Sequence, residues 1–269
     1  MRSEVRAAAR SAEHNPVLRV LARAGYAANG VMHALIGIIV LAAAFGGSGA
    51  ADQTGAFRSV AAAPWGFALL WAIAVGLIAL GVWHAVAAVG ARRARRTQRL
   101  GILAAEIGQA VVFATVGAVA ASVALGARPS AERAAEDASA GVLSMPGGPF
   151  LLAAVGLGVA IAGVAFVVMG VRRSFRSKVT LPRTAWGHAV AGLGVAGFVA
   201  KGIALFIVGV LLGVAAVQVD PGQAGGLDGA VQALLQLPAG PLLGVAVGAG
   251  FLAYGAFTIL RARFAKLSV

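Results

Sequence analysis

The stretch PWGFALLWAIAVGLIALG (64–81) recurs in altered form as PGGPFLLAAVGLGVAIAG (146–163) and PAGPLLGVAVGAGFLAYG (238–255). Each copy begins with a proline, and glycines follow it 12 and 17 residues later. These glycines are Gly76 and Gly81, Gly158 and Gly163, and Gly250 and Gly255. A pattern that returns at a fixed spacing indicates an internal repeat, and a repeat decides the fold before any single element is assigned.

The segments that precede the three copies match one another as well. Gly25-x4-Gly30-x6-Gly37 corresponds to Gly197-x4-Gly202-x6-Gly209, and the middle copy keeps only Gly117. The sequence therefore predicts three copies of a two-helix hairpin, spaced about 80–90 residues apart. Inside lipid there is no hydrophobic force between helices, so small residues are needed to let backbones approach closely. We expect all of these glycines to pack between helices.

Composition indicates a membrane protein. The chain has 269 residues, of which 60% are hydrophobic and 12% are charged, whereas soluble domains have about a quarter charged residues. Apolar segments long enough to span a bilayer are expected near 24–46, 65–89, 100–126, 148–171, 190–217 and 240–262. Their apolar runs are continuous and do not alternate, which excludes a β-barrel. The predicted fold is an all-α integral membrane protein with an N-terminal segment (1–23) and repeats at 24–90, 100–173 and 185–263.

The distribution of lysine and arginine predicts the orientation. Eighteen of these residues lie in the N-terminal segment, in the links after the second and fourth apolar segments, and in the C-terminal tail. The other three links carry only Arg58, Arg128 and Arg133. Positive residues favour the cytoplasmic side, so we expect both termini in the cytoplasm. The hairpins then share one orientation, which predicts parallel repeats about a pseudo-threefold axis along the membrane normal.

The net charge of +13 has a plain explanation in this topology. Because the basic residues flank the predicted spans, they fit contact with anionic inner-leaflet lipid better than contact with nucleic acid. The first twenty residues contain no apolar run, so no cleavable signal peptide is predicted.

The segment LARAGYAANGVMHALIGIIVLAAA (21–44) resembles the signature of a bacterial membrane family known only as a domain of unknown function, number 1206. Members of that family have the two-helix hairpin three times over nearly the whole chain. In the third copy Phe198 replaces the tyrosine found at Tyr26, and the middle copy is the most divergent. The resemblance implies a six-helix integral membrane protein, and it implies no particular activity.

Polar side chains occur on the first, third and fifth predicted spans. In the repeat register one slot holds Asn29, Gln109 and Lys201, and a slot three residues earlier holds Tyr26, Glu106 and Phe198. Buried Asn and Gln commonly form interhelical hydrogen bonds worth about 0.6 kcal/mol, but a charge in mid-membrane costs about 2.5–3.5 kcal/mol. We expect one intramembrane polar cluster facing the central axis, in which Glu106 pairs with Lys201 for either a structural or a functional purpose. Its members are Tyr26, Asn29, His33, Glu106, Gln109 and Lys201.

Other residues have simpler interpretations. Trp83 and His84 near the end of the second span, and Trp186 and His188 before the fifth, are predicted to anchor the helices at the interface. A short interfacial helix capped by Asp228 is predicted before the last span.

The sequence contains no catalytic motif and no cysteine, so we predict no enzyme activity, cofactor or metal. Two hypotheses about function remain. One is a closed helical module that binds lipid or a membrane partner subunit. The other is a transporter or channel for a small solute or ion, with a polar axis lined by the odd-numbered spans.

Overall fold

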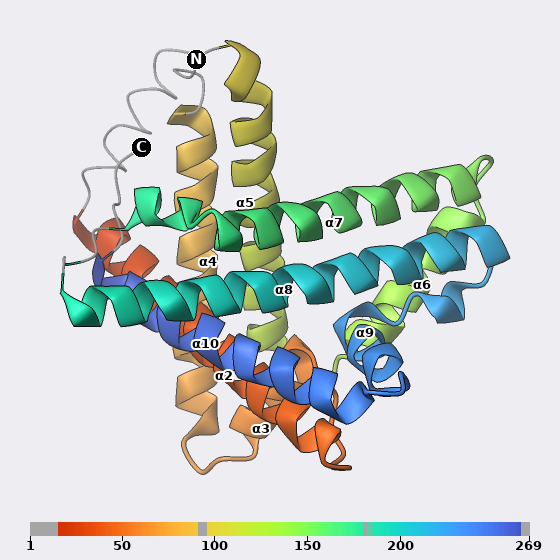
Figure 1. The fold of residues 1–269 in the computed structure, drawn as a ribbon, viewed down its shortest axis with the longest axis horizontal. Coiled ribbons are helices and arrows are strands. Elements are labelled where there is room, and N and C mark those ends of the chain that lie inside the picture. Colours follow the sequence, from red (N-terminus) through yellow and green to blue (C-terminus); the bar gives the residue numbers. More distant parts are fainter. Residues whose placement is uncertain (1–15, 91–95, 180–181, 183, 265–269) are drawn as a thin grey trace.

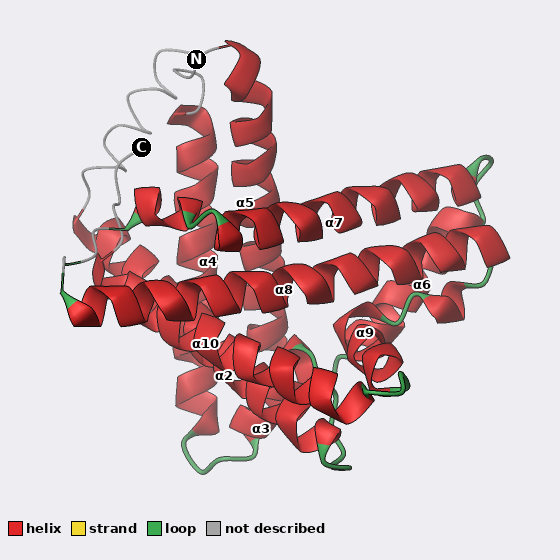
Figure 2. Cartoon of the chain, viewed as in Figure 1, coloured by secondary structure: helices red, strands yellow, loops and turns green. Residues whose placement is uncertain are grey.

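The computed structural model describes residues 16–90, 96–179, 182 and 184–264. Helices are the regular elements throughout these ranges, and the ranges contain no β-strand (Figure 2). The long helices are α2 (Pro16–Ala44), α4 (Gly66–Gly90), α5 (Arg96–Ala124), α7 (Gly148–Val171), α8 (Ala185–Gln218) and α10 (Gly240–Phe264). All six are long and apolar enough to cross a membrane. Helices α2 and α8 begin earlier than expected, at Pro16 and Ala185, because each continues past its apolar segment.

A short helix precedes the second long helix of every repeat. These helices are α3 (Gln53–Ala61), α6 (Ala131–Leu143) and α9 (Gly226–Leu235), and each ends five residues before the next long helix begins. The turn between them requires glycine at an equivalent place, because a Cβ there would collide with a carbonyl oxygen of the preceding short helix. The glycines concerned are Gly66, Gly148 and Gly240. The short helices thus extend the internal repeat beyond the membrane spans.

The long helices pack side by side in the order α5, α4, α2, α10, α8, α7. Three of these joints connect different repeats, namely α4–α5, α7–α8 and α10–α2, and two connect helices of one repeat, namely α2–α4 and α8–α10. The remaining joint of a closed ring, α5–α7 in the middle repeat, lacks the extended contact of the others. Figure 1 shows the consequence, since the α4–α5 pair runs steeply across the α7–α8 pair. Within the described residues the six long helices therefore form an open series, with α5 and α7 at its two ends.

The main hydrophobic core lies at the end of the bundle that carries α3, α6 and α9, here called the short-helix end. Phe57 of α3 is fully buried there, between Ile36 and Val40 of α2 and Leu70 of α4, and Phe251 of α10 belongs to the same cluster. The ends of the long helices that lie away from α3, α6 and α9 are here together called the basic end. It carries the 3-10 turn η2 (Ser174–Lys178) and the arginines around it.

Candidate functional site

Glycines form the joints between different repeats, and they do so in one register. A Cβ added to Gly30 would lie 2.7 Å from the carbonyl oxygen of Gly255, and one added to Gly202 would lie 2.6 Å from that of Gly163. At the third joint a Cβ on Gly81 would lie 3.0 Å from the oxygen of Ala110, which occupies the slot of Gly30. Further along the same joints Gly37, Gly209 and Gly117 approach the carbonyls of Gly248, Gly156 and Ala74.

Glycines also form the joints inside the first and third repeats. Gly25 lies against Gly76, and Gly197 lies against the backbone of Tyr254. Gly250 lies against Ala200 in the third repeat. Gly158 occupies the slot of Gly76 and Gly250 in the middle repeat, but a Cβ added there would meet nothing within 4 Å. The packing expected for Gly158 is absent because α5 does not lie along α7.

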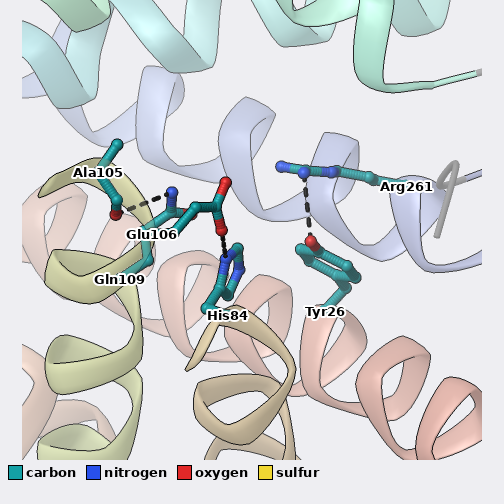
Figure 3. Close-up of polar contacts among 6 residues, drawn as sticks. All are labelled: Tyr26, His84, Ala105, Glu106, Gln109 and Arg261. Carbon is teal, nitrogen blue, oxygen red and sulfur yellow. Dashed lines mark hydrogen bonds and ion pairs between the residues drawn. The ribbon is translucent and has the colours of Figure 1, made fainter. Parts of the chain in front are cut away.

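The polar side chains form two clusters, not one. The first lies in the basic half of the bundle, where His84 of α4 contacts Glu106 of α5 at 2.6 Å between Nδ1 and Oε2 (Figure 3). A carboxylate accepts hydrogen bonds, so the imidazole Nδ1–H donates. The His84 ring also stacks on Phe113, with the ring centroids 5.4 Å apart. This contact fastens α4 to α5.

A second contact belongs to the same cluster. Arg261 of α10 donates from Nη2 to the hydroxyl oxygen of Tyr26 on α2 at 3.3 Å, and its guanidinium lies 4.4 Å from the centre of the tyrosine ring. Tyr26 is within electrostatic range of both Arg261 and Glu106, and Figure 3 draws the two contacts together. We call Tyr26, His84, Glu106 and Arg261 the basic-end cluster. Gln109 is close by, but it donates to the carbonyl of Ala105 on its own helix.

Two buried nitrogens of the basic-end cluster have no hydrogen-bond partner within the described part of the chain. They are Nε2 of His84 and Nε of Arg261. The His84 side chain is 5% exposed and the Glu106 side chain is 14% exposed. The cluster therefore combines two buried nitrogens that lack a partner among the described residues with a carboxylate that still reaches the surface.

The other cluster lies at mid-bundle, where Lys201 of α8 meets α2. Its Nζ is 3.1 Å from Nε2 of His33, while Nδ1 of His33 is 2.8 Å from the backbone carbonyl of Asn29. Because a carbonyl can only accept, Nδ1 carries the hydrogen, and the free lone pair on Nε2 accepts from the ammonium. The ammonium also lies 4.6 Å and 5.4 Å from the ring centres of Tyr254 and Phe166, an arrangement that favours a cation. We call Asn29, His33 and Lys201, with these rings, the lysine cluster.

The predicted direct pairing of Glu106 with Lys201 is not found. Among the described residues no ion pair joins the two, and each charge contacts a histidine instead. The reason is that Glu106 faces the α4–α5 joint, whereas Lys201 points towards α2 and α10. The repeat register contained the missing signal. His84 occupies the slot of Phe166, and Glu106 occupies that of Phe198, which stacks on Phe166 at the α7–α8 joint.

Two other predictions need correction. Trp83 and His84 are not interfacial anchors, because both are 4% exposed and lie inside the bundle. Trp186 and His188, for which the same interfacial position was predicted, are exposed at the start of α8. Asp228 does not cap α9, since it lies in the first turn of that helix and accepts from the backbone N–H of Ala51 at 2.6 Å. This bond ties the short helix of the third repeat to the link between α2 and α3 in the first.

The described residues include no group of three His, Cys, Asp or Glu side chains that could hold a metal ion. What they define is a helical protein of three repeated hairpins, with six candidate membrane-spanning helices and two polar clusters between helices. The chain belongs to the family DUF1206, a Domain of Unknown Function, which matches residues 24–91, 105–173 and 196–265.

The chain is also similar to the uncharacterized protein YxxB of Bacillus subtilis (strain 168). The two are 28% identical over 254 residues, which covers 93% of this chain and 92% of the relative. No solved structure matches the chain.

Proposed function

We propose that this protein is a non-catalytic module of the bacterial cell membrane that binds anionic lipid of the inner leaflet at its basic end. Both termini are cytoplasmic in this proposal, and the three hairpins run parallel about a pseudo-threefold axis. The common register of the three joints between repeats supports that symmetry. The observation that carries the proposal is the contrast between the apolar core at the short-helix end and the exposed arginines at the basic end.

The apolar end supports a module that does not conduct. Phe57, Ile36, Val40 and Leu70 fill the space between the long helices there, and none of them is more than 1% exposed. A route for ions or polar solutes needs polar groups or water along its length. The two polar clusters between helices lie at mid-bundle and in the basic half. The buried carboxylates at the short-helix end, Asp52 and Asp228, accept from backbone N–H groups.

The basic end offers a surface suited to lipid headgroups. Arg172, Arg173 and Arg176 are exposed around η2, and Trp186 is exposed at the start of α8. Arginine near an anionic leaflet contributes about 1 kcal/mol per residue, and tryptophan is enriched at the same depth. This combination supports phosphate-bearing lipid as the ligand.

The test compares thermal stabilisation by lipid in matched variants. The purified protein is placed in nanodiscs of phosphatidylcholine with or without phosphatidylglycerol, and Tm is measured. We expect phosphatidylglycerol to raise the Tm of the parent chain and of the Arg128→Gln/Arg133→Gln control, whose arginines are exposed at the other end. The rise should be mostly lost in Arg172→Gln/Arg173→Gln/Arg176→Gln. An equal rise in all three proteins would contradict the proposal.

A second candidate, proton-linked transport of a small solute, is favoured by one observation. The His84–Glu106 contact joins two titratable groups, and His84 has a second nitrogen with no partner in the described residues. Liposome flux with a panel of small ions and solutes tests this candidate. Flux that is abolished by Glu106→Gln would support transport over the lipid-binding module.

A further inference from the structure

The open side of the ring is bounded by one face of α5 and one face of α7. We infer that these two faces are an interaction surface for each other, and that α5 docks along α7 in the bilayer to close the six-helix ring. This inference does not rest on the proposed function, because closure follows from the repeat and from membrane geometry.

The repeat identifies the residues that would meet. In the first repeat Gly25 of α2 lies against Gly76 and Leu80 of α4. In the third repeat Gly197 of α8 lies against Tyr254 of α10, which occupies the slot of Leu80. The middle repeat places Ala105, Gly158 and Ala162 in these slots. All three are as small as close helix packing requires.

The exposure of the equivalent residues distinguishes the open α5–α7 joint from the formed α2–α4 and α8–α10 joints. Gly25, Gly76, Gly197 and Gly250 are buried, whereas Ala105, Gly158 and Ala162 are exposed. Over their most apolar windows α5 and α7 are each 17% buried, compared with 50–56% for α2, α4 and α10. The value for α8 is 33%. Within the described residues, α5 and α7 each leave uncovered a face whose counterpart is occupied in the other two repeats.

Membrane geometry points the same way. Helices that span one bilayer tilt by about 20° on average, within a range of about 0–40°. In Figure 1 the α4–α5 pair runs steeply across the α7–α8 pair. Placing both pairs across one bilayer therefore needs a rotation that brings α5 and α7 towards a common direction. The tight glycine joints α4–α5 and α7–α8 can move as rigid pairs in this rotation.

Closure has a consequence for the basic-end cluster. Glu106 follows Ala105 on α5, and its side chain is 14% exposed in the open ring. Tyr26, which holds the same slot in the first repeat, is 4% exposed because α4 covers it. Docking of α7 would cover Glu106 in the same way. Closure of the α5–α7 joint would therefore bury the part of the Glu106 side chain that is exposed in the open ring.

Cysteine cross-linking in native membranes tests the inference directly, since the chain contains no cysteine of its own. The test pair is Ala105→Cys/Ala162→Cys. The control is Ala105→Cys/Val164→Cys, because Val164 lies at nearly the same depth on the far side of α7 and is 50% exposed. After mild oxidation we expect the test pair to lose most of its free thiol and to migrate as a monomer. The control should retain its thiols.

Two results would overturn the inference. If the test pair forms no more cross-link than the control, α5 does not reach α7. If it forms a disulfide-linked dimer, the face is covered by a second copy of the chain.

A stability measurement gives an independent readout without thiol chemistry. Gly158→Leu has free space in the open ring but would clash in the closed one, and Gly192→Leu on α8 also has free space. We expect Gly158→Leu to lower Tm in lipid nanodiscs clearly more than Gly192→Leu does. An equal Tm for the two variants would overturn closure.

Discussion

His84 and Glu106 form a 2.6 Å contact across the α4–α5 joint, in the same register slots that hold Phe166 and Phe198 at the α7–α8 joint. The α4–α5 joint is thus held by a polar contact, and the equivalent α7–α8 joint is held by stacked aromatic rings. The equivalence shows that the backbone register is kept while the chemistry of the slot changes.

This equivalence predicts the outcome of replacing the polar contact. His84→Phe should destabilise the protein by about 1.5–3 kcal/mol, because Glu106 loses a buried charge-assisted hydrogen bond. The double change His84→Phe/Glu106→Phe reproduces the pairing of the α7–α8 joint and should recover much of that loss. Unfolding in detergent, followed by circular dichroism, measures both effects. A double variant less stable than His84→Phe would show that the two joints are not equivalent.

The lysine cluster should behave as a separate unit. Lys201→Met removes the donor to Nε2 of His33 and should cost about 1–3 kcal/mol. Because Lys201 and Glu106 have different partners, the free-energy changes of Lys201→Met and Glu106→Gln should add within about 0.5 kcal/mol in the double variant. The same unfolding assay measures the sum. A double variant markedly more stable than the sum would mean that the two charges interact after all.

The joints between repeats should be sensitive to side-chain volume. Gly30→Leu and Gly202→Leu place a side chain against the backbones of Gly255 and Gly163, so each should destabilise by about 1–3 kcal/mol. Gly213→Leu on α8 is the control, because a Cβ there would meet nothing within 4 Å. Melting in detergent distinguishes them, and an unchanged Tm for Gly30→Leu would mean that the Gly30 position does not pack tightly.

The sequence was sufficient to predict the six long helices and their repeat, but the short helices α3 and α6 were missed. Continuous apolar runs predict spanning helices because the backbone must satisfy its own hydrogen bonds in lipid, and the proline and glycine pattern predicts three equivalent hairpins. The partners of the polar side chains were not predicted. Depth in the membrane placed Glu106 near Lys201, but the direction in which each side chain points depends on helix rotation about the joint, which depth does not reveal.

The absence of an α5–α7 contact could not be predicted from the sequence, for a different reason. Ala105, Gly158 and Ala162 have the composition of a packed joint, and the pattern alone cannot distinguish an occupied face from a vacant one. His84 could have been predicted better, because its slot in the other repeats is filled by Phe166 and Thr258, and a slot inside a joint is not an interfacial one.

The central claim is that three equivalent hairpins cross one membrane in the same direction, with the basic end in the cytoplasm. Ala62, Ser144 and Gln236 follow directly after α3, α6 and α9, and all three are exposed. A single cysteine at any of these positions should react with a membrane-impermeant maleimide on intact cells. A cysteine at Ser177, in the η2 turn, should react only after the membrane is permeabilised. Protection of any one of the three outer positions, or external labelling at Ser177, would contradict the account.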